Sequence, residues 1–178
     1  MITFLVGGAR SGKSTLAVQL GERHADAGGT IVFVATTEPF DDDLRARVAA
    51  HRRERPDWPT VEAPVALAEA LAVTPLDALV IVDCLTVWLG NLLHHLPDAA
   101  DRTAAIDAFL HSLRARTGPT VVVSNEVGLG LHPDTPLGRE YRDDLGRLNQ
   151  RVAAVADRAL FLVAGRALPL VDPWEVLS

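Results

Sequence analysis

The sequence predicts an α/β fold in which a mostly parallel central sheet is flanked by helices. Two observations support this prediction. Short apolar, β-branched runs alternate with helical stretches along the chain, which is typical of parallel strands joined by helices. The first run is followed directly by a glycine-rich turn and a helical pattern, an order that suits a buried strand leading into a helix N-terminus. With 178 residues, of which 48% are hydrophobic, the chain can bury its own core, so we expect one domain over residues 1–178.

The expected strands are the short apolar runs, which are suited to burial inside a parallel sheet. They lie at residues 2–6, 30–36, 78–83, 120–125 and 159–164. A last apolar run at 167–171 contains Pro169, and proline is tolerated in a strand only at the edge of a sheet. We therefore expect this run to add an antiparallel edge strand at the C-terminal end.

The expected helices lie between these strands and are bounded by turn residues and helix stop signals. The first follows the glycine turn and ends at Gly28-Gly29, and the second has acidic residues at its start, arginines toward its end and Pro56 after it. The fifth ends before Gly118-Pro119, and the sixth follows the turn region 133–136. In order, the expected helices are 13–27, 41–54, 64–73, 86–96, 99–116 and 139–157.

Composition and charge exclude several classes of protein. The net charge of −6 argues against a broad nucleic-acid surface, so we expect no nucleic-acid partner. Cys84 is the single cysteine, so no intrachain disulfide can form and nothing indicates an oxidising compartment. The sequence has no apolar run long enough to span a bilayer and no signal-peptide pattern, so we expect a cytoplasmic protein. A local basic cluster suits a small anionic ligand, and it consists of Arg45, Arg47, Arg52, Arg53 and Arg55.

The glycine turn matches the phosphate-binding loop G-x-x-x-x-G-K-[ST] in full. Its residues are Gly7, Gly8, Ala9, Arg10, Ser11, Gly12, Lys13 and Ser14. The backbone N–H groups of such a loop and the helix dipole bind phosphate, while Lys13 neutralises charge and the Ser14 hydroxyl ligates Mg²⁺. Lys13 is the only lysine of the chain, and its compact ammonium reaches phosphates without the planar fork of arginine. The alternative is a chance glycine turn, which the strand-to-helix setting disfavours.

Acidic residues close two of the later expected strands. Asp83 ends the third strand, where phosphate-loop proteins place a carboxylate that holds Mg²⁺. The alternative is that Asp83 caps the next helix or closes an Asx turn. Glu126 follows the strand at 120–125, and it either orients a substrate hydroxyl or caps a turn.

The expected helix at 41–54 carries one histidine in an unusual setting. Leu44, Val48 and His51 follow the i, i+4, i+7 spacing of one helix face, with Arg52 and Arg55 close by. An imidazole there can meet an anion. By residue chemistry alone, a single histidine on an apolar face is more often structural, so the nucleophilic and structural interpretations both stay open.

An ordered set of motifs resembles the bifunctional adenosylcobinamide kinase/adenosylcobinamide-phosphate guanylyltransferase family, almost from end to end. Besides the phosphate loop, the motifs are Ala35-Thr36-Thr37, His51-Arg52-x-x-Arg55-Pro56, Val82-Asp83-Cys84-Leu85-Thr86-x-Trp88-Leu89-x-Asn91, Ser124-Asn125-Glu126-Val127-Gly128 and Arg142-Asp143-x-x-Gly146-x-x-Asn149-Gln150. The histidine and arginine motif, placed after a strand that ends in two threonines, is the most specific of them.

The resemblance implies a phosphate-loop NTPase with a RecA-like sheet, and two reactions that use ATP or GTP with Mg²⁺. In the first, a nucleoside triphosphate phosphorylates the aminopropanol hydroxyl of adenosylcobinamide. In the second, GTP donates GMP to adenosylcobinamide phosphate, and the family's covalent histidine corresponds to His51. The implied nucleotide contacts beyond the loop are Ala35, Thr36, Thr37, Arg52, Arg53, Glu54, Arg55, Glu62 and Asp83. The implied metal ligands are Ser14 and Asp83.

The family also implies a homotrimer, and the apolar residues Trp88, Leu92 and Leu93 are expected to be exposed on one helix for such an interface. Two rival functions remain at this point. One is a small-molecule kinase that uses Lys13 but leaves His51 structural. The other is a GTP-controlled binding module without covalent chemistry.

Overall fold

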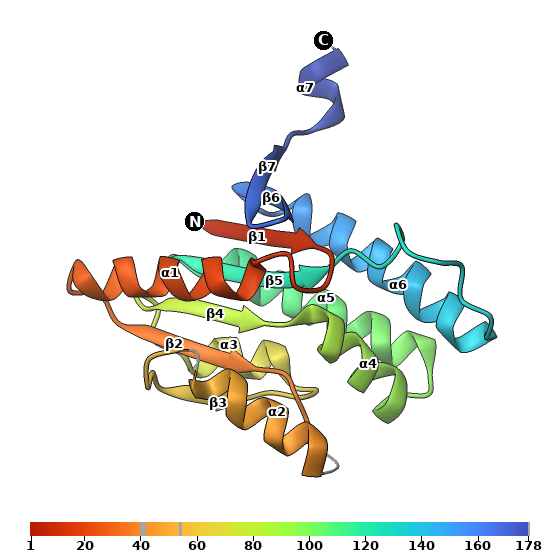
Figure 1. Cartoon of the computed structure of the whole chain (residues 1–178), viewed down its shortest axis with the longest axis horizontal. Coiled ribbons are helices and arrows are strands. Elements are labelled where there is room, and N and C mark those ends of the chain that lie inside the picture. Colours follow the sequence, from red (N-terminus) through yellow and green to blue (C-terminus); the bar gives the residue numbers. More distant parts are fainter. Residues whose placement is uncertain (40–41, 54, 178) are drawn as a thin grey trace.

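The centre of the molecule is a seven-stranded sheet (Figure 1). The structure is a computed structural model that describes residues 1–39, 42–53 and 55–177, without the side chains of Asp43, Leu44, Arg47, Ala50 and His51. The strand order is β3-β2-β4-β5-β1-β6-β7, and all neighbours are parallel except β6 and β7. The strands are β1 (Ile2–Gly7), β2 (Ile31–Ala35), β3 (Thr60–Glu62), β4 (Leu79–Asp83), β5 (Thr120–Asn125), β6 (Arg158–Val163) and β7 (Arg166–Leu170). The mostly parallel sheet and its antiparallel C-terminal edge strand are confirmed.

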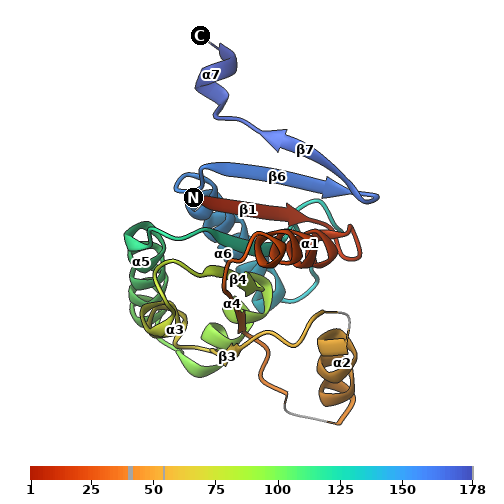
Figure 2. The ribbon, with the colours of Figure 1, turned by 90° about the vertical axis from the view of Figure 1, so that its left-hand side faces the viewer.

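Helices cover both faces of this sheet. One face packs against α1, and the other packs against the four helices α3 to α6 (Figure 2). The helices are α1 (Lys13–Asp26), α2 (Asp42–Arg53), α3 (Leu67–Val73), α4 (Leu85–His95), α5 (Ala99–Ala115), α6 (Pro136–Ala153) and α7 (Pro173–Leu177). Within the described ranges, none of these helices has the length and apolar character to cross a membrane.

Alternate residues of the buried strands contribute to the two faces. Along β1, Leu5 packs in the core layer beneath α1, whereas Phe4 and Val6 pack in the layer beneath α3 to α6. This is the period-2 alternation of a strand that is buried on both sides. Since every residue of β1 is buried, the strand that leads into the phosphate loop is held from both faces.

The expectation that Trp88, Leu92 and Leu93 are exposed is wrong. Trp88 and Leu92 are fully buried in α4 and Leu93 is half-buried. The Trp88 indole packs against Phe109 of α5 with 5.1 Å between ring centroids, and it donates a hydrogen bond to the Val65 carbonyl oxygen. The apolar side chains of α4 pack into the core against neighbouring elements such as α5, and they are therefore not available as a subunit surface.

Two short elements and the bounds of two helices differ from the sequence-based expectation. The strand β3 and the helix α7 were not expected, because three and five residues carry too little periodicity to identify. The helix α3 begins at Leu67 instead of residue 64, and α6 spans Pro136–Ala153 instead of 139–157. Its Thr135 N-cap side chain accepts a hydrogen bond from the Gly138 N–H, and proline is favoured in the first turn of a helix. The proline therefore starts this helix and does not precede it as part of a turn.

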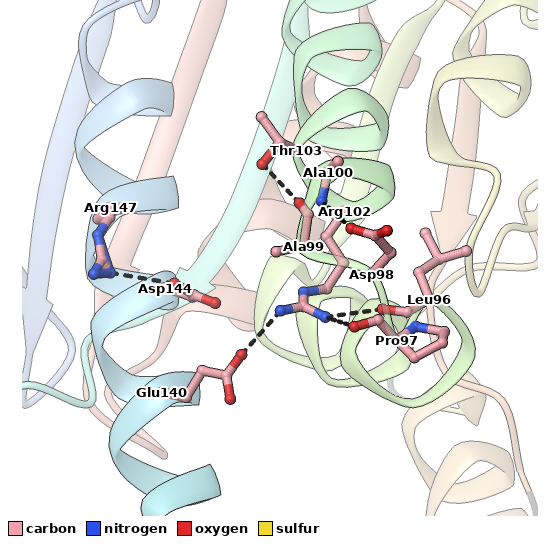
Figure 3. Close-up of polar contacts among 10 residues, drawn as sticks. All are labelled: Leu96, Pro97, Asp98, Ala99, Ala100, Arg102, Thr103, Glu140, Asp144 and Arg147. Carbon is pink, nitrogen blue, oxygen red and sulfur yellow. Dashed lines mark hydrogen bonds and ion pairs between the residues drawn. The ribbon is translucent and has the colours of Figure 1, made fainter.

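A single arginine joins three helices on the α4, α5 and α6 face of the molecule (Figure 3). Arg102 in the first turn of α5 donates hydrogen bonds to the carbonyl oxygens of Leu96 and Pro97, which connect α4 to α5. It also donates to the Glu140 carboxylate of α6 at 2.9 Å. Because its side chain is largely buried, this arginine fixes the spacing of the helices that support the sheet.

A second buried arginine, Arg116, lies at the end of α5, and we expect its substitution to lower the stability of the protein strongly. Its buried guanidinium donates to the carbonyl oxygens of Leu71, Pro75 and Ala78 and to the Thr74 hydroxyl. We expect R116A to lower the free energy of unfolding by about 2–4 kcal/mol, because several buried acceptors lose their donor. Urea denaturation measures this, with the exposed neighbour variant R114A as the control. Equal stability of the two variants would contradict the structural role of Arg116.

Candidate nucleotide site

The phosphate loop connects β1 to α1, and glycine is required where the chain makes close contacts. A Cβ on Gly7 would lie 2.2 Å from the Leu162 carbonyl oxygen of β6. Gly12, the N-cap of α1, has a φ of +100°, and a Cβ there would lie 3.3 Å from the Gly165 Cα. The N–H of Gly165 also donates to the Ser11 carbonyl oxygen at 3.0 Å. The turn between β6 and β7 therefore supports the loop from its outer side.

Lys13 is the first residue of α1, and its side chain is held inside the loop. Its Nζ donates to the Gly8 carbonyl oxygen at 2.6 Å and to Ser11 Oγ at 3.3 Å. Burial lowers the pKa of Lys13, while Cys84 and Asp83 act in the opposite direction and favour its charged form. Ser14 follows, half-buried in the first turn of α1. The loop therefore has an ammonium that interacts electrostatically with a carboxylate from another strand, and a hydroxyl next to it in sequence.

That carboxylate, Asp83, is the last residue of β4. In the sheet register it lies beside Ala35 of β2 and Val123 of β5. The buried Thr36 hydroxyl donates to the Cys84 carbonyl oxygen at 2.8 Å and accepts from the Cys84 N–H at 2.9 Å. The chain directly after Asp83 is thereby fixed to the end of β2. The N-cap of α4 is Cys84, so the alternative in which Asp83 caps that helix is wrong.

A cavity of about 220 Å³ lies at the carboxyl ends of β2 and β4, beside α2 and β3. Parallel sheets bind ligands at this edge. Asp83 lines the cavity and also acts electrostatically on Lys13, so the cavity adjoins the phosphate loop. The lining residues are Phe33, Ala35, Thr37, Pro39, Val48, Arg52, Arg55, Thr60, Glu62 and Asp83.

Arg55 is the buried cation of this cavity. Its guanidinium lies 4.0 Å from the centroid of the Phe33 ring and donates to the Thr60 hydroxyl at 2.7 Å. Burial lowers the pKa of Arg55 and the neighbouring Arg52 lowers it further, while Asp57 and Asp83 oppose the shift. Its Nε is buried without a hydrogen-bond partner among the described residues. Such a group is suited to an anionic or carbonyl-bearing ligand.

The structure brings most of the predicted nucleotide contacts to this one edge. Six of the residues expected outside the phosphate loop line the cavity, and they are Ala35, Thr37, Arg52, Arg55, Glu62 and Asp83. Thr36 is fully buried and its hydroxyl is bonded to Cys84, while Arg53 is exposed on α2. Glu54 and the side chain of His51 lie outside the described residues. The backbone of His51 belongs to α2, between Val48 and Arg52, which both line the cavity.

Comparison with known proteins identifies the family. Residues 3–170 match the family model described as cobinamide kinase / cobinamide phosphate guanyltransferase. The chain belongs to this family. As a member, it is a bifunctional enzyme that combines a kinase with a guanylyltransferase, and the resemblance seen in its motifs is confirmed.

Two relatives align over nearly the whole chain. The bifunctional adenosylcobalamin biosynthesis protein CobP of Pseudomonas aeruginosa is 41% identical over 173 residues, which cover 96% of this chain and 97% of the relative. The bifunctional adenosylcobalamin biosynthesis protein CobU of Escherichia coli is 36% identical, over 93% of this chain and 97% of the relative.

Among solved structures, the flagellar accessory protein FlaH from Methanocaldococcus jannaschii is similar in fold. The match covers 95% of this chain and 77% of that structure's chain, with a TM-score of 0.54 at 12% identity. This last likeness supports the RecA-like phosphate-loop fold alone.

Four cavity residues of this family member were not predicted from its sequence. The sequence indicates Phe33 and Val48 only as apolar positions of a strand and of a helix face, and it gives no role to Pro39 or Thr60. The strand alternation of β2 is the one signal that could have indicated Phe33, since it places Phe33 and Ala35 on the same face. Thr60 could not be found without β3, because only pairing with β2 places it beside Arg55.

The residues present fit a magnesium ion that is shared with a nucleotide. The Ser14 hydroxyl and the Asp83 carboxylate would supply oxygen ligands, the type that Mg²⁺ prefers. In the described parts of the chain, no group of three or more His, Cys, Asp or Glu side chains could hold a metal on its own. Mg²⁺ usually keeps several waters and binds through one or two protein oxygens and substrate phosphates. The site therefore suits a metal that arrives with its nucleotide.

Proposed function

We propose that this enzyme phosphorylates the aminopropanol hydroxyl of adenosylcobinamide with ATP or GTP, and then transfers GMP from GTP to the resulting phosphate. The products are adenosylcobinamide-GDP and pyrophosphate. The observation that carries the proposal is the shared carboxylate Asp83, which lies between the phosphate loop and the arginine-lined cavity. One triphosphate bound across both parts would place its γ-phosphate at Lys13 and its nucleoside toward Arg55.

For the kinase step, the protein mainly positions the phosphates and neutralises charge. The substrate hydroxyl oxygen forms a bond to the γ-phosphorus as the bond to the β,γ-bridging oxygen breaks, which releases a nucleoside diphosphate and a proton. Loop N–H groups and Lys13 stabilise the charge that spreads over the phosphoryl oxygens. Ser14 and Asp83 would hold Mg²⁺, which neutralises charge between the phosphates.

For guanylyl transfer, we assign the nucleophile to His51. An imidazole nitrogen forms a bond to the α-phosphorus and pyrophosphate leaves; an oxygen of adenosylcobinamide phosphate then displaces the histidine and takes the GMP. The neighbouring cations Arg52 and Arg55 would offset the negative charge of the two substrates. The position of His51 between two cavity-lining residues of α2 supports this assignment.

Product analysis tests the proposed function and separates it from its rivals. The purified enzyme is incubated with adenosylcobinamide, Mg²⁺ and either ATP or GTP, and the corrinoids are identified by mass spectrometry. We expect adenosylcobinamide phosphate with ATP and adenosylcobinamide-GDP with GTP. Phosphorylation without any GDP product would favour a simple kinase, and no corrinoid product would favour a binding module.

We also propose that the enzyme acts in the cytoplasm as a homotrimer that forms through its C-terminal arm, residues 166–177. All residues of β7 are exposed, and α7 projects away from the sheet (Figures 1 and 2). The arm exposes several large apolar side chains, including Leu168, Val171, Trp174 and Leu177. Contiguous apolar surface and a free strand edge are typical of subunit interfaces.

A polar substitution in the C-terminal arm is expected to disrupt the trimer. We expect the wild-type enzyme to have the mass of a trimer, and W174D to dissociate to monomers at micromolar concentration, because a carboxylate would be buried in an apolar interface. The conservative variant W174F is the control and should remain trimeric. Size-exclusion chromatography with light scattering measures all three. A monomeric wild type, or a trimeric W174D, would contradict the role of the arm.

A further inference from the structure

An exposed apolar loop lies at the same edge of the sheet as the nucleotide site. The leucine loop, residues 126–137, connects β5 to α6 and includes the first two residues of that helix. Leu129 is 78% exposed and Leu131 is 96% exposed, and Leu137 at the start of α6 is also exposed. Three exposed leucines in one short connection form an apolar surface that no described element covers, which marks it as a site for a ligand or a partner.

Hydrogen bonds hold this loop in place from both of its ends. The Glu126 N–H donates to the Gly7 carbonyl oxygen at 3.0 Å, and the Glu126 carboxylate accepts from the Gly128 N–H at 2.6 Å. Of the two roles considered for Glu126, the contact seen is the one that closes a turn. At the other end, Arg139 of α6 donates to the carbonyl oxygens of Pro133 and Asp134. The leucines therefore extend into solvent from a fixed backbone.

The position of the loop relates it to phosphate transfer. The loop leaves β5, which lies between β1 with the phosphate loop and β4 with Asp83. The cavity that suits the nucleoside lies on the other side of β4, at β2 and β3. The Glu126 N–H is bonded to the Gly7 carbonyl oxygen, so the loop begins directly beside the phosphate loop, where an acceptor must reach the γ-phosphorus.

We propose that the leucine loop binds the corrin ring of the acceptor substrate, an inference that rests on the proposed function. A corrinoid is a wide, largely apolar macrocycle edged with amide groups, and its reactive hydroxyl is at the end of a flexible chain. Such a substrate needs apolar contact outside the phosphate site, within reach of its chain. Leu129 and Leu131 supply this contact from the loop that begins beside Gly7. A second copy of the chain on this surface would cover the path of the acceptor, so the substrate is the occupant that the location favours.

Equilibrium dialysis of coloured adenosylcobinamide against the wild type and the double variant L129S/L131S tests the proposal. We expect the Kd of the variant for adenosylcobinamide to rise by about 10-fold or more, because two leucines lose apolar contact with the ring. The affinity for a fluorescent GTP analogue should stay the same, since the nucleotide cavity is on the other side of β4. The matched control is V73S/L76S, which removes two exposed apolar side chains where α3 leads into β4, at the amino ends of the strands.

Each outcome is decisive for the inference. A wild type that binds and phosphorylates adenosylcobinamide while L129S/L131S matches it would overturn the inference but leave the proposed function intact. A wild type that binds GTP but neither binds nor phosphorylates the corrinoid would overturn both. Loss of the trimer in L129S/L131S, measured by light scattering, would identify the loop as a subunit interface and also overturn the assignment. Weaker corrinoid binding with unchanged GTP affinity and mass supports it.

Discussion

Replacing Lys13 by arginine is expected to lower both phosphoryl and guanylyl transfer by about 100-fold or more. The substitution keeps the positive charge, so the effect tests geometry. Lys13 is 6% exposed, and its Nζ is enclosed by the Gly8 carbonyl and the Ser11 hydroxyl. The longer, planar guanidinium cannot occupy that position without moving the loop whose N–H groups would bind phosphate.

Initial rates of both reactions, measured at saturating nucleotide, check this expectation. The control is R23K, which changes an exposed cation near the end of α1, away from the phosphate loop. We expect the control to match the wild type. Near-normal rates for K13R would mean that the loop does not bind the reacting phosphates.

The second large effect is expected for H51A, which should lower guanylyl transfer by about 1,000-fold or more. A covalent route through His51 cannot operate without its imidazole, and nothing else in the route replaces the missing P–N bond. The kinase activity should stay within a few-fold of the wild type, since γ-phosphoryl transfer depends on Lys13, Ser14 and Asp83.

Separate assays measure the two activities of H51A. ATP with adenosylcobinamide reports the kinase step, and GTP with prepared adenosylcobinamide phosphate reports guanylyl transfer. H111A, which removes an exposed histidine of α5, is the matched control and should retain both activities. Equal losses of both activities in H51A would indicate a structural role for His51, the alternative that residue chemistry alone left open.

The parts of the fold that were predictable from sequence are those with local signals. The β1 strand, its glycine loop and α1 follow one another without a gap, and each has its own pattern in the sequence. The C-terminal edge strand was identified because Pro169 is compatible only with such a position. By contrast, β3 exists because Thr60, Val61 and Glu62 pair with β2, and pairing between distant segments leaves no local pattern.

The candidate site shows the same division. Residues at strand ends, such as Asp83, could be placed because the carboxyl ends of parallel strands share one edge. The contact of Arg55 with Phe33 and Thr60 was not predictable, because it depends on how α2 and β3 pack beside β2. The burial of Trp88 was missed for a related reason: its neighbour Phe109 comes from another helix, α5.

The most direct test of the account is whether GTP leaves its α-phosphate on the enzyme. Wild-type enzyme is incubated with Mg²⁺ and GTP labelled at either the α- or the γ-phosphate, without corrinoid, and is then denatured and separated from free nucleotide. We expect only the α-label to remain, in a bond that is labile in acid and stable in mild base, on a peptide that contains His51. The absence of α-label, or its location on any other residue, would contradict the covalent mechanism.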